Sequence, residues 1–192
     1  FDKFADADNA LSTQMKATGE VMSVGRSFEE SLLKGIRSLE TGAYHLDLPK
    51  FGTWTKENLL QYIAAGTDDR IFAVAELFRR GQDAETIAEV TKIDLFFLRK
   101  IRNITAMEQA LESAPGDISV LREAKKAGFS DRETARLWHK SERDIFELRR
   151  AHGIMPVYKM IDTCASEFSS YIPYFYSTYE TENESVVSEK KK

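Results

Sequence analysis

Helix caps and glycine breaks alternate at short intervals through the middle of this chain, and they constrain its fold more than any other feature. Ser, Thr and Asp are preferred N-caps because their side-chain oxygens accept the unpaired N–H groups of a first helical turn. Glycine commonly follows a helix C-terminus. Candidate caps stand at Thr55, Asp68, Asp83, Asp94, Asp117, Ser130 and Ser141, and candidate breaks at Gly66, Gly81, Pro115 with Gly116, Gly128 and Gly153. The pattern predicts consecutive short helices from residue 55 to about residue 153.

Part of this pattern of caps and glycine breaks occurs twice, at a constant offset of 47 residues. Gly81, Asp83, Ala88, Asp94, Leu98 and Ile101 correspond in order to Gly128, Ser130, Ala135, Ser141, Ile145 and Leu148. Each copy predicts a helix-turn-helix hairpin that cannot bury its apolar stripe alone, so it packs on the other copy or on the preceding helices. Two copies are too few for a solenoid. The expected fold is mainly α, an orthogonal helical bundle of two hairpins plus preceding helices, with short extended segments at both ends.

The flanking regions have different patterns. Residues 20–24 read as a short strand between two glycines. Ser27 with Glu30 forms a candidate capping box for a helix that ends near Thr41. Residues 49–54 look like a linker. Residues 156–161 and the Tyr-rich stretch 171–179 suit strands or extended segments that pack against a partner. Residues 181–192 are charged and are expected to be a disordered tail.

The composition is that of a globular protein with a real core, because 42% of its 192 residues are hydrophobic and 30% are charged. A net charge of −4 argues against a broad nucleic-acid footprint. A single cysteine excludes an internal disulfide framework. No apolar run approaches the roughly 20 residues of a membrane helix. The chain begins with Phe1 and not with Met, so we expect it to be a processed or excised product of a longer protein. No signal-peptide pattern is visible either, but excision would remove one.

Few residues suggest chemistry. Neither a P-loop nor a G-x-G-x-x-G pattern occurs, and Gly25 is interpreted as a turn residue with phosphate binding as the lesser alternative. His45, His139 and His152 are far apart in sequence and favour structural roles over metal ligation. Cys164 is interpreted as a small buried thiol; a nucleophilic role would need a base from a distant part of the chain.

The second hairpin invites a nucleic-acid interpretation because it is locally basic. Acidic residues are interleaved with the basic residues, however, so ion pairs between residues four apart can neutralise much of the positive charge. The basic residues are Arg132, Arg136, Lys140, Arg143, Arg149 and Arg150, and the acidic ones Asp131, Glu133, Glu142, Asp144 and Glu147. Helix packing is favoured, and a stand-alone nucleic-acid-binding or adaptor module stays as the alternative.

Aromatic residues also allow two interpretations. Phe72, Phe78, Phe96, Phe97 and Phe146 are expected in the core. Alternatively, Phe96 and Phe97 face about 100° apart on one helix and serve two surfaces. One would be the domain interior and the other a subunit interface, where aromatic residues are enriched.

Two segments have sequences more distinctive than those of ordinary amphipathic helices. The first runs through residues 14–26 and contains Gly-Glu-Val-Met followed by Gly-Arg; the second runs through residues 156–168 and contains Val-Tyr-Lys and Asp-Thr-Cys-Ala, followed by Tyr-Ser-Thr-Tyr-Glu at 176–180. Together with Asp69-Arg70-Ile71 and Thr91-Lys92-Ile93-Asp94 between them, they resemble the middle of the large subunit of carbamoyl-phosphate synthase. In that family a helical oligomerisation domain joins two ATP-grasp halves. The resemblance covers nearly the whole chain.

The resemblance implies a division into four parts. Residues 1–45 would end the first ATP-grasp half, 46–155 form the oligomerisation domain, 156–180 connect to the second half, and 181–192 form the tail. The parent enzyme, meaning the longer protein, would make carbamoyl phosphate from bicarbonate, ammonia from glutamine and two ATP molecules, for pyrimidine and arginine biosynthesis. Its ATP and its Mg²⁺ or Mn²⁺ would bind elsewhere, so we expect no catalytic, cofactor-binding or metal residue here.

The implied partners are further copies of the chain, the neighbouring ATP-grasp halves and a glutaminase subunit or domain, with no nucleic acid and no membrane. The implied compartment is the cytoplasm, or the mitochondrion of a eukaryotic parent. One departure from the family pattern is visible. Where many relatives have an Ile-Asp-Arg-Trp-Phe-Leu-like run, this chain has Leu95 and Phe96 at the Arg-Trp positions. These two residues are the candidate interface, and the substitution puts contacts inferred there in question.

Overall fold

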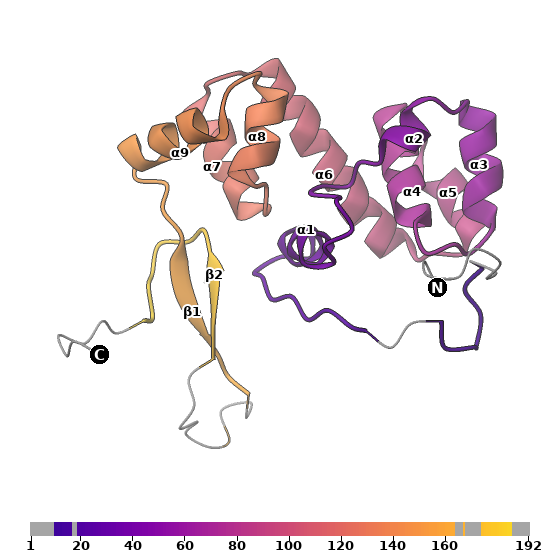
Figure 1. The fold of residues 1–192 in the computed structure, drawn as a ribbon, viewed down its shortest axis with the longest axis horizontal. Coiled ribbons are helices and arrows are strands. Elements are labelled where there is room, and N and C mark those ends of the chain that lie inside the picture. The colour runs from indigo at the N-terminus through magenta and orange to yellow at the C-terminus, as the bar shows by residue number, and fades with distance from the viewer. Residues whose placement is uncertain (1–9, 17–18, 164–166, 168–173, 186–192) are drawn as a thin grey trace. The chain divides into compact units, whose positions relative to one another are not determined.

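The computed structural model describes residues 10–16, 19–163, 167 and 174–185 of the chain. Within them the fold is mainly α, as the sequence predicts, with a single two-stranded sheet near the C-terminal end (Figure 1). The elements are α1 (Phe28–Ser38), α2 (Pro49–Gly52), α3 (Lys56–Ala64), α4 (Arg70–Arg79), α5 (Ala84–Thr91), α6 (Leu95–Ser113), α7 (Ile118–Lys126), α8 (Asp131–Leu137), α9 (Glu142–Ala151), β1 (Val157–Ile161) and β2 (Tyr174–Thr178).

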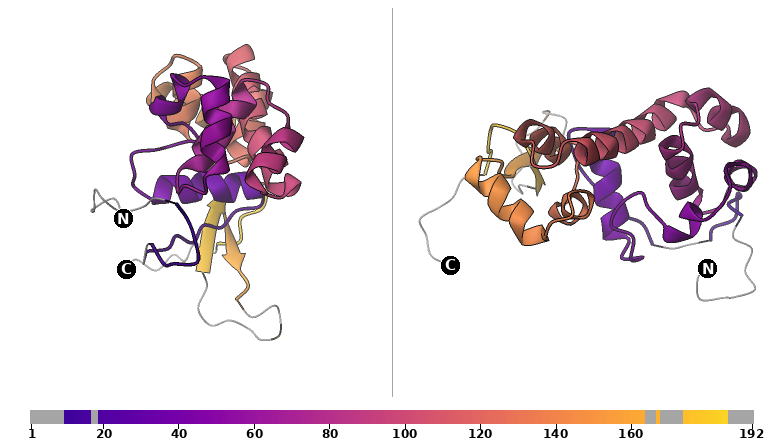
Figure 2. Two further views of the ribbon diagram at one scale, coloured as in Figure 1. Left: turned by 90° about the vertical axis from the view of Figure 1, so that its right-hand side faces the viewer. Right: turned by 90° about the horizontal axis from the view of Figure 1, so that it is seen from above.

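The chain divides into two compact units. The first unit comprises residues 1–22 and 32–110, and the second comprises residues 23–31 and 111–192. Helix α6 belongs to both, and Figure 2 shows it as one uninterrupted helix. The boundaries expected at residues 45, 155 and 180 stay predictions.

In the first unit, α3 packs against α4 and α5, and α2 packs against α4. Apolar side chains at helical spacing fill the interior: Leu59, Ile63, Val74, Leu77, Ile87, Leu98 and Ile104 are fully buried. The expected linker at 49–54 is wrong in part, because Pro49 starts the short helix α2 and its Phe51 is buried. The Phe51 ring lies 5.3 Å from Trp54 and 5.4 Å from Tyr62, so an aromatic cluster holds this segment to α3.

In the second unit, α8 packs against α9. Its buried apolar residues include Leu121, Ala124, Phe129, Leu137, Trp138 and Ile145. The Trp138 indole Nε1 donates to the Leu111 carbonyl oxygen at 2.8 Å, which satisfies the polar group of an otherwise apolar ring.

Most predicted caps are confirmed. The side chains of Thr55, Asp83, Asp117, Ser130 and Ser141 accept first-turn N–H groups, and Ser141 forms a reciprocal capping box with Asp144. The Asp94 carboxylate accepts the Phe96 N–H at 2.7 Å. Asp68 is wrong as a cap because α4 begins one residue later, after Asp69. The Asp69 carboxylate does not cap the helix either; it accepts from Lys50 Nζ and from the Tyr62 hydroxyl.

The internal repeat is confirmed and extends to the helix before each hairpin. Gly81 and Gly128 both have positive φ, and so do Lys92 and His139, again 47 residues apart. The N–H of Gln82 donates to the Leu77 carbonyl just as that of Phe129 donates to the Ala124 carbonyl. Because these bonds close the ends of α4 and α7 in the same way, the repeating unit is α4–α5–α6 and α7–α8–α9, three helices instead of two.

The two strands form an antiparallel hairpin in which Tyr158 lies opposite Ser177 and Met160 opposite Phe175. The other edge of β1 is covered by the start of the expected disordered tail. The Glu184 N–H donates to the Tyr158 carbonyl, and the Glu184 carboxylate accepts the Met160 N–H at 2.7 Å. This part of the tail is therefore held to β1 by a backbone and a side-chain hydrogen bond, while residues 186–192 lie outside the described residues.

At the other end, residues 20–24 form no strand, so that expectation is wrong within the described residues. An isolated bridge joins Ala10 and Thr67. The segment 23–31 instead belongs to the second unit. The buried Glu30 carboxylate accepts the Arg26 N–H at 2.7 Å and the Thr178 hydroxyl at 3.1 Å, which ties the start of α1 to β2.

Candidate functional site

The first turn of α6 exposes two large aromatic side chains. Phe96 is 54% exposed and Phe97 44% exposed, and their rings meet edge to face at 5.3 Å. The Lys100 ammonium lies 5.6 Å from the Phe96 ring centre, within the range of a cation–π contact. The neighbouring Leu95 is half-buried. The candidate interface residues Leu95 and Phe96 thus lie together at an accessible helix start.

The position of each aromatic residue on its helix explains this exposure. The core side of α6 carries Leu98, Ile101 and Ile104, all buried. Phe96 precedes this stripe by two residues, so it points away from the core. The expectation of a five-residue aromatic core is therefore wrong in part: Phe78 is buried and Phe72 half-buried, while Phe96, Phe97 and Phe146 are exposed.

The second copy of the repeat shows what the hairpin itself requires at these positions. Leu95, Phe96 and Phe97 correspond to Glu142, Arg143 and Asp144 at the start of α9. There Asp144 completes the capping box, and the Arg143 guanidinium pairs with Glu147 at 2.8 Å. Because the same hairpin forms with charged residues in its second copy, the exposed aromatic pair of the first copy is not needed for the fold.

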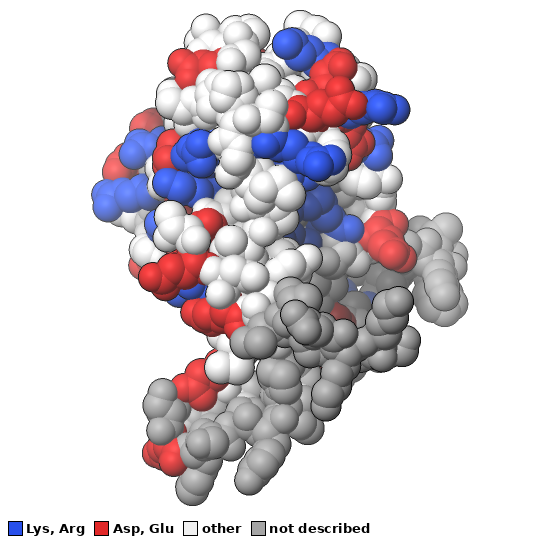
Figure 3. All heavy atoms as spheres, turned by 90° about the vertical axis from the view of Figure 1, so that its left-hand side faces the viewer, with Lys and Arg blue, Asp and Glu red and all other residues white. Residues whose placement is uncertain are grey.

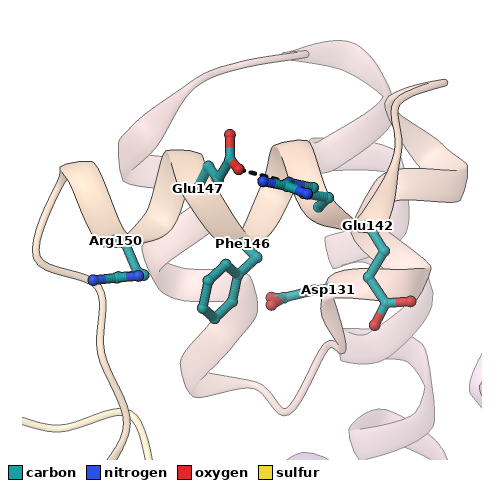
Figure 4. Close-up of a pocket in the computed structure, with 6 residues that line it drawn as sticks. Asp131, Glu142, Phe146, Glu147 and Arg150 are labelled. Carbon is teal, nitrogen blue, oxygen red and sulfur yellow. Dashed lines mark hydrogen bonds and ion pairs between the residues drawn. The ribbon is translucent and has the colours of Figure 1, made fainter.

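A hollow of about 470 Å³ lies beside α9 in the second unit. Figure 4 shows the Phe146 ring pointing into it between Arg150 and Asp131, with Glu142 on the far side. The remaining lining residues are Arg143 and Glu147, which bind each other. The hollow mixes acidic and basic side chains around one aromatic ring, so it has no single sign of charge with which to select a ligand.

A buried charge cluster supports the first unit. The Glu108 carboxylate accepts from Arg79 Nε at 2.7 Å and Nη2 at 2.8 Å, and His45 Nε2 lies 2.7 Å from Glu108 Oε1. Burial raises the pKa of Glu108, but the hydrogen bonds from Arg79 and His45 outweigh it and lower that pKa to about 2. His45 is buried, in agreement with its structural interpretation. The cluster lies in the interior, so we interpret the lowered pKa of Glu108 as a sign of a structural role and not of catalysis.

A second cluster supports the second unit. The Asp131 carboxylate accepts from Lys125 Nζ and from Arg149 Nε, each at 2.7 Å. Lys125 and Arg149 are buried and also face the Tyr179 ring, at 4.9 and 6.0 Å from its centre. Both cations are therefore compensated inside the unit instead of being offered to an external anion.

Three basic residues of the second hairpin pair with carboxylates of the same hairpin: Arg136 with Glu133, Arg143 with Glu147, and Arg149 with Asp131. At the start of α9, where a recognition helix would meet a phosphate backbone, Glu142 and Asp144 are exposed. Figure 3 shows Lys and Arg intermixed with Asp and Glu over the face in view. These observations do not favour the nucleic-acid alternative.

The sequence-predicted chemical residues are not brought together. His139 and His152 are exposed at helix ends, and Cys164 lies outside the described residues. A side chain at Gly25 would lie 2.8 Å from the Glu30 carboxylate, so this glycine lets an anionic side chain approach closely. Among the described residues, no three His, Cys, Asp or Glu are grouped so that they could hold a metal ion. No helix in the described part of the chain is long and apolar enough to cross a membrane.

The hairpin exposes an apolar face that sequence reasoning anticipated only as a partner-facing segment. Tyr158, Met160 and Phe175 are 48, 50 and 42% exposed, and the strand register places them on one face. The sequence of β1, VYKMI, does not show which face is exposed; only the structure shows that Lys159, between the two exposed residues, is buried.

Comparison with known protein families agrees with the architecture described above. Residues 20–153 match the sequence model of a family described as the oligomerisation domain of the carbamoyl-phosphate synthetase large chain. The match covers well over half of the chain and includes both copies of the three-helix repeat. An oligomerisation domain implies self-association. The chain belongs to the family of carbamoyl-phosphate synthetase large-chain oligomerisation domains.

Proposed function

We propose that this chain serves its parent enzyme as a structural domain, and that it self-associates through the first turn of α6, with Leu95 and Phe96 in the contact. The parent would make carbamoyl phosphate from bicarbonate, ammonia and two ATP molecules in the cytoplasm, or in the mitochondrion of a eukaryotic cell. In this proposal the chain contributes rigidity and an interface. It holds no catalytic residue and no binding site for ATP, Mg²⁺ or Mn²⁺.

The comparison of the two repeat copies carries the proposal. Phe96 and Phe97 are exposed where the second copy has Arg143 and Asp144, and in both copies a short helix is followed, after a residue of positive φ, by a second helix. Exposed aromatic side chains that the fold does not need are typical of the contact core of an interface, where aromatic residues are enriched and charged ones depleted.

The test exchanges the aromatic pair for the residues of the second copy. In the variant Phe96→Arg with Phe97→Asp, we expect self-association measured by sedimentation velocity to weaken by about 30-fold or more, the effect of losing an interface hot spot. Circular dichroism should be unchanged, because α9 forms with these residues.

The matched control is Phe146→Arg, which removes an exposed aromatic residue of the second copy and introduces the residue type of the equivalent Arg99. This variant should associate like the unmodified chain. Undiminished association of the double variant, or equal weakening by the control, would refute an interface at the start of α6.

We infer that the flanks of the helical region contact other parts of the parent enzyme, namely the neighbouring ATP-grasp halves, with the glutaminase subunit or domain joining the same assembly. The exposed hairpin face of Tyr158, Met160 and Phe175 supports this inference, as does Met22, which is 86% exposed. In the full-length parent, Met160→Glu should increase protease cleavage near residue 160, whereas Met155→Glu outside that face should not. Equal cleavage of the two variants would contradict the docked hairpin.

A further inference from the structure

We propose that the self-association surface is two-fold symmetric, with α5 of one protomer lying against α6 of a second copy of the chain. The inference rests on the proposed function and adds the arrangement of the partner. We call the surface the α5–α6 face and define it by Glu85, Glu89, Phe96, Arg99 and Lys100.

Charges of opposite sign are separated between the two helices of this face. Helix α5 has the sequence AETIAEVT, so its only charged residues are the acids Glu85 and Glu89, both exposed and one helical turn apart. The first half of α6 contains only basic charged residues, with Arg99 and Lys100 before any acid. The hairpin therefore presents an acidic helix beside a basic one.

The two rows of charge lie next to each other. Arg99 Nη2 is 3.7 Å from Glu85 Oε1, and both side chains remain about 60% exposed, since their exposed fractions are 57 and 61%. Phe96 lies on the same stripe of α6 as Arg99 and Lys100, three and four residues earlier. The face thus carries an acidic row, a basic row and an aromatic residue at the basic row's N-terminal end.

A two-fold symmetric dimer would pair both charged rows of this face with rows of opposite charge. In such an interface both subunits present the same patch, so residue i meets residue j and j meets i. If α6 faced α6, the basic residues of both copies would meet and repel each other. If α5 faces α6 of the other copy, both acidic rows meet basic rows, and like-charge contacts are avoided. Because the contact closes on itself, it gives a dimer and no open chain of subunits.

The equivalent face of the second repeat copy is a poorer self-partner. At the positions 47 residues later it has Arg132 and Arg136 on α8, and Arg143, Phe146 and Glu147 on α9, so α8 is basic there and α9 carries both signs of charge. There Arg143 and Glu147 pair within α9 at 2.8 Å, whereas the Glu85–Arg99 pair of the first copy joins its two helices at 3.7 Å. The separation of charge between two helices is found only on the first of the two copies, and this favours it as the dimer surface.

The test uses two charge-reversed variants of the chain, Glu85→Lys with Glu89→Lys and Arg99→Glu with Lys100→Glu. Each variant alone makes both helices of the face the same sign, so each should self-associate about tenfold or more weakly than the unmodified chain. An equimolar mixture should form a heterodimer of nearly the original affinity, because every acidic row again meets a basic one. The variant with all four changes should recover self-association.

Matched controls separate this arrangement from a general effect of charge. Glu123→Lys with Lys126→Glu reverses an exposed ion pair of α7 and should leave association unchanged. Circular dichroism melts would identify any unfolded variant, since the exposed Glu85–Arg99 pair itself contributes little to stability. If the two charge-reversed variants associate normally, or if their mixture stays monomeric, the two-fold arrangement is wrong. The aromatic exchange at Phe96 and Phe97 tests the interface independently of that result.

Discussion

At the scale of single residues, we expect the free energy of unfolding to depend strongly on the buried Glu108 carboxylate. Replacing it in Glu108→Gln keeps the shape but removes the charge that compensates the Arg79 guanidinium. Breaking a buried ion pair leaves an uncompensated charge, so we expect a loss of about 3 kcal/mol of unfolding free energy. Urea denaturation checks this value. Glu112→Gln, at an exposed site one turn later in α6, is the control and should change little.

The same carboxylate sets a pH dependence. The pKa of Glu108 is lowered in the folded chain to about 2 from an ordinary value of 4.5. The stability it provides is therefore complete above about pH 4.5 and is lost as the pH falls toward 2. The difference in unfolding free energy between the unmodified chain and Glu108→Gln should shrink over that range. A difference that stays constant from pH 6 to pH 2.5 would contradict the assigned ionisation.

Two equivalent glycines give a prediction with an internal control. Gly81 and Gly128 both have positive φ, and a side chain at Gly81 would meet nothing within 4 Å. At Gly128 a Cβ would lie 2.7 Å from the Glu30 Cα, against backbone that cannot simply rotate away. Gly81→Ala should cost about 1 kcal/mol for the left-handed conformation alone. Gly128→Ala should cost clearly more in thermal or urea unfolding, and equal losses would exclude the close approach of Glu30.

At the scale of helices and strands, the two repeat copies share a backbone pattern but bury different side chains. The first copy buries Phe78 and Ala84, whereas the second has the buried Lys125 and the half-buried Asp131 at the equivalent positions. The apolar pair needs no further partner. The ionic pair needs Arg149 and the Tyr179 ring as well, because buried charges are stable only with complete hydrogen bonding. The second copy is thus more dependent on contacts from the C-terminal part of its unit.

This dependence predicts an asymmetric response to alanine. Asp131→Ala introduces the residue found at the equivalent Ala84, so the helix itself should tolerate it. It leaves Lys125 and Arg149 uncompensated, and we expect a loss of about 3 kcal/mol or more in urea unfolding. Adding Lys125→Phe, which restores the apolar pair of the first copy, should recover part of that loss. A double variant less stable than the single one would show that the charges are not the cause.

Local signals predicted the elements well. Caps such as Asp83 and Ser141 and breaks such as Gly81 depend on interactions within a few residues, so the sequence contains the whole signal. The repeat was recognised only from Gly81 onward because α4 and α7 differ in side chains, as Phe78 and Lys125 illustrate, although their ends have the same hydrogen bonds.

Long-range partners could not be predicted in this way. Nothing near His45 indicates that it meets Glu108, 63 residues later. The sequence allowed two positions for Phe96, the core or an interface, because its hydrophobicity suits both equally. Only the packing of α6 shows that this side chain is exposed. Residues 20–24 have the composition of a strand, but a strand forms only where a pairing edge is available.

At the scale of the whole molecule, polar groups are used mainly to hold the chain's own elements together. Side-chain carboxylates and hydroxyls occupy the N-termini of α5, α7, α8 and α9, and two ion clusters are enclosed within their units. Among the described residues, large apolar side chains are exposed at the start of α6 and on one face of the hairpin. A molecule of this kind is suited to binding other protein surfaces.

The helix N-termini of this chain are poorly suited to bind a nucleotide. A phosphate group binds helix N-termini through free first-turn N–H groups and a positive field. In this chain Asp83 and Asp117 accept those N–H groups themselves, and Glu85 and Glu142 add negative charge to the first turns of α5 and α9. Titration of the chain with Mg-ATP in a calorimeter should therefore give only the heat of dilution, and so should titration with Mg²⁺ alone. Saturable heat that requires the nucleotide would mean that the chain takes part in the chemistry of its parent, and the purely structural role proposed for it would have to be abandoned.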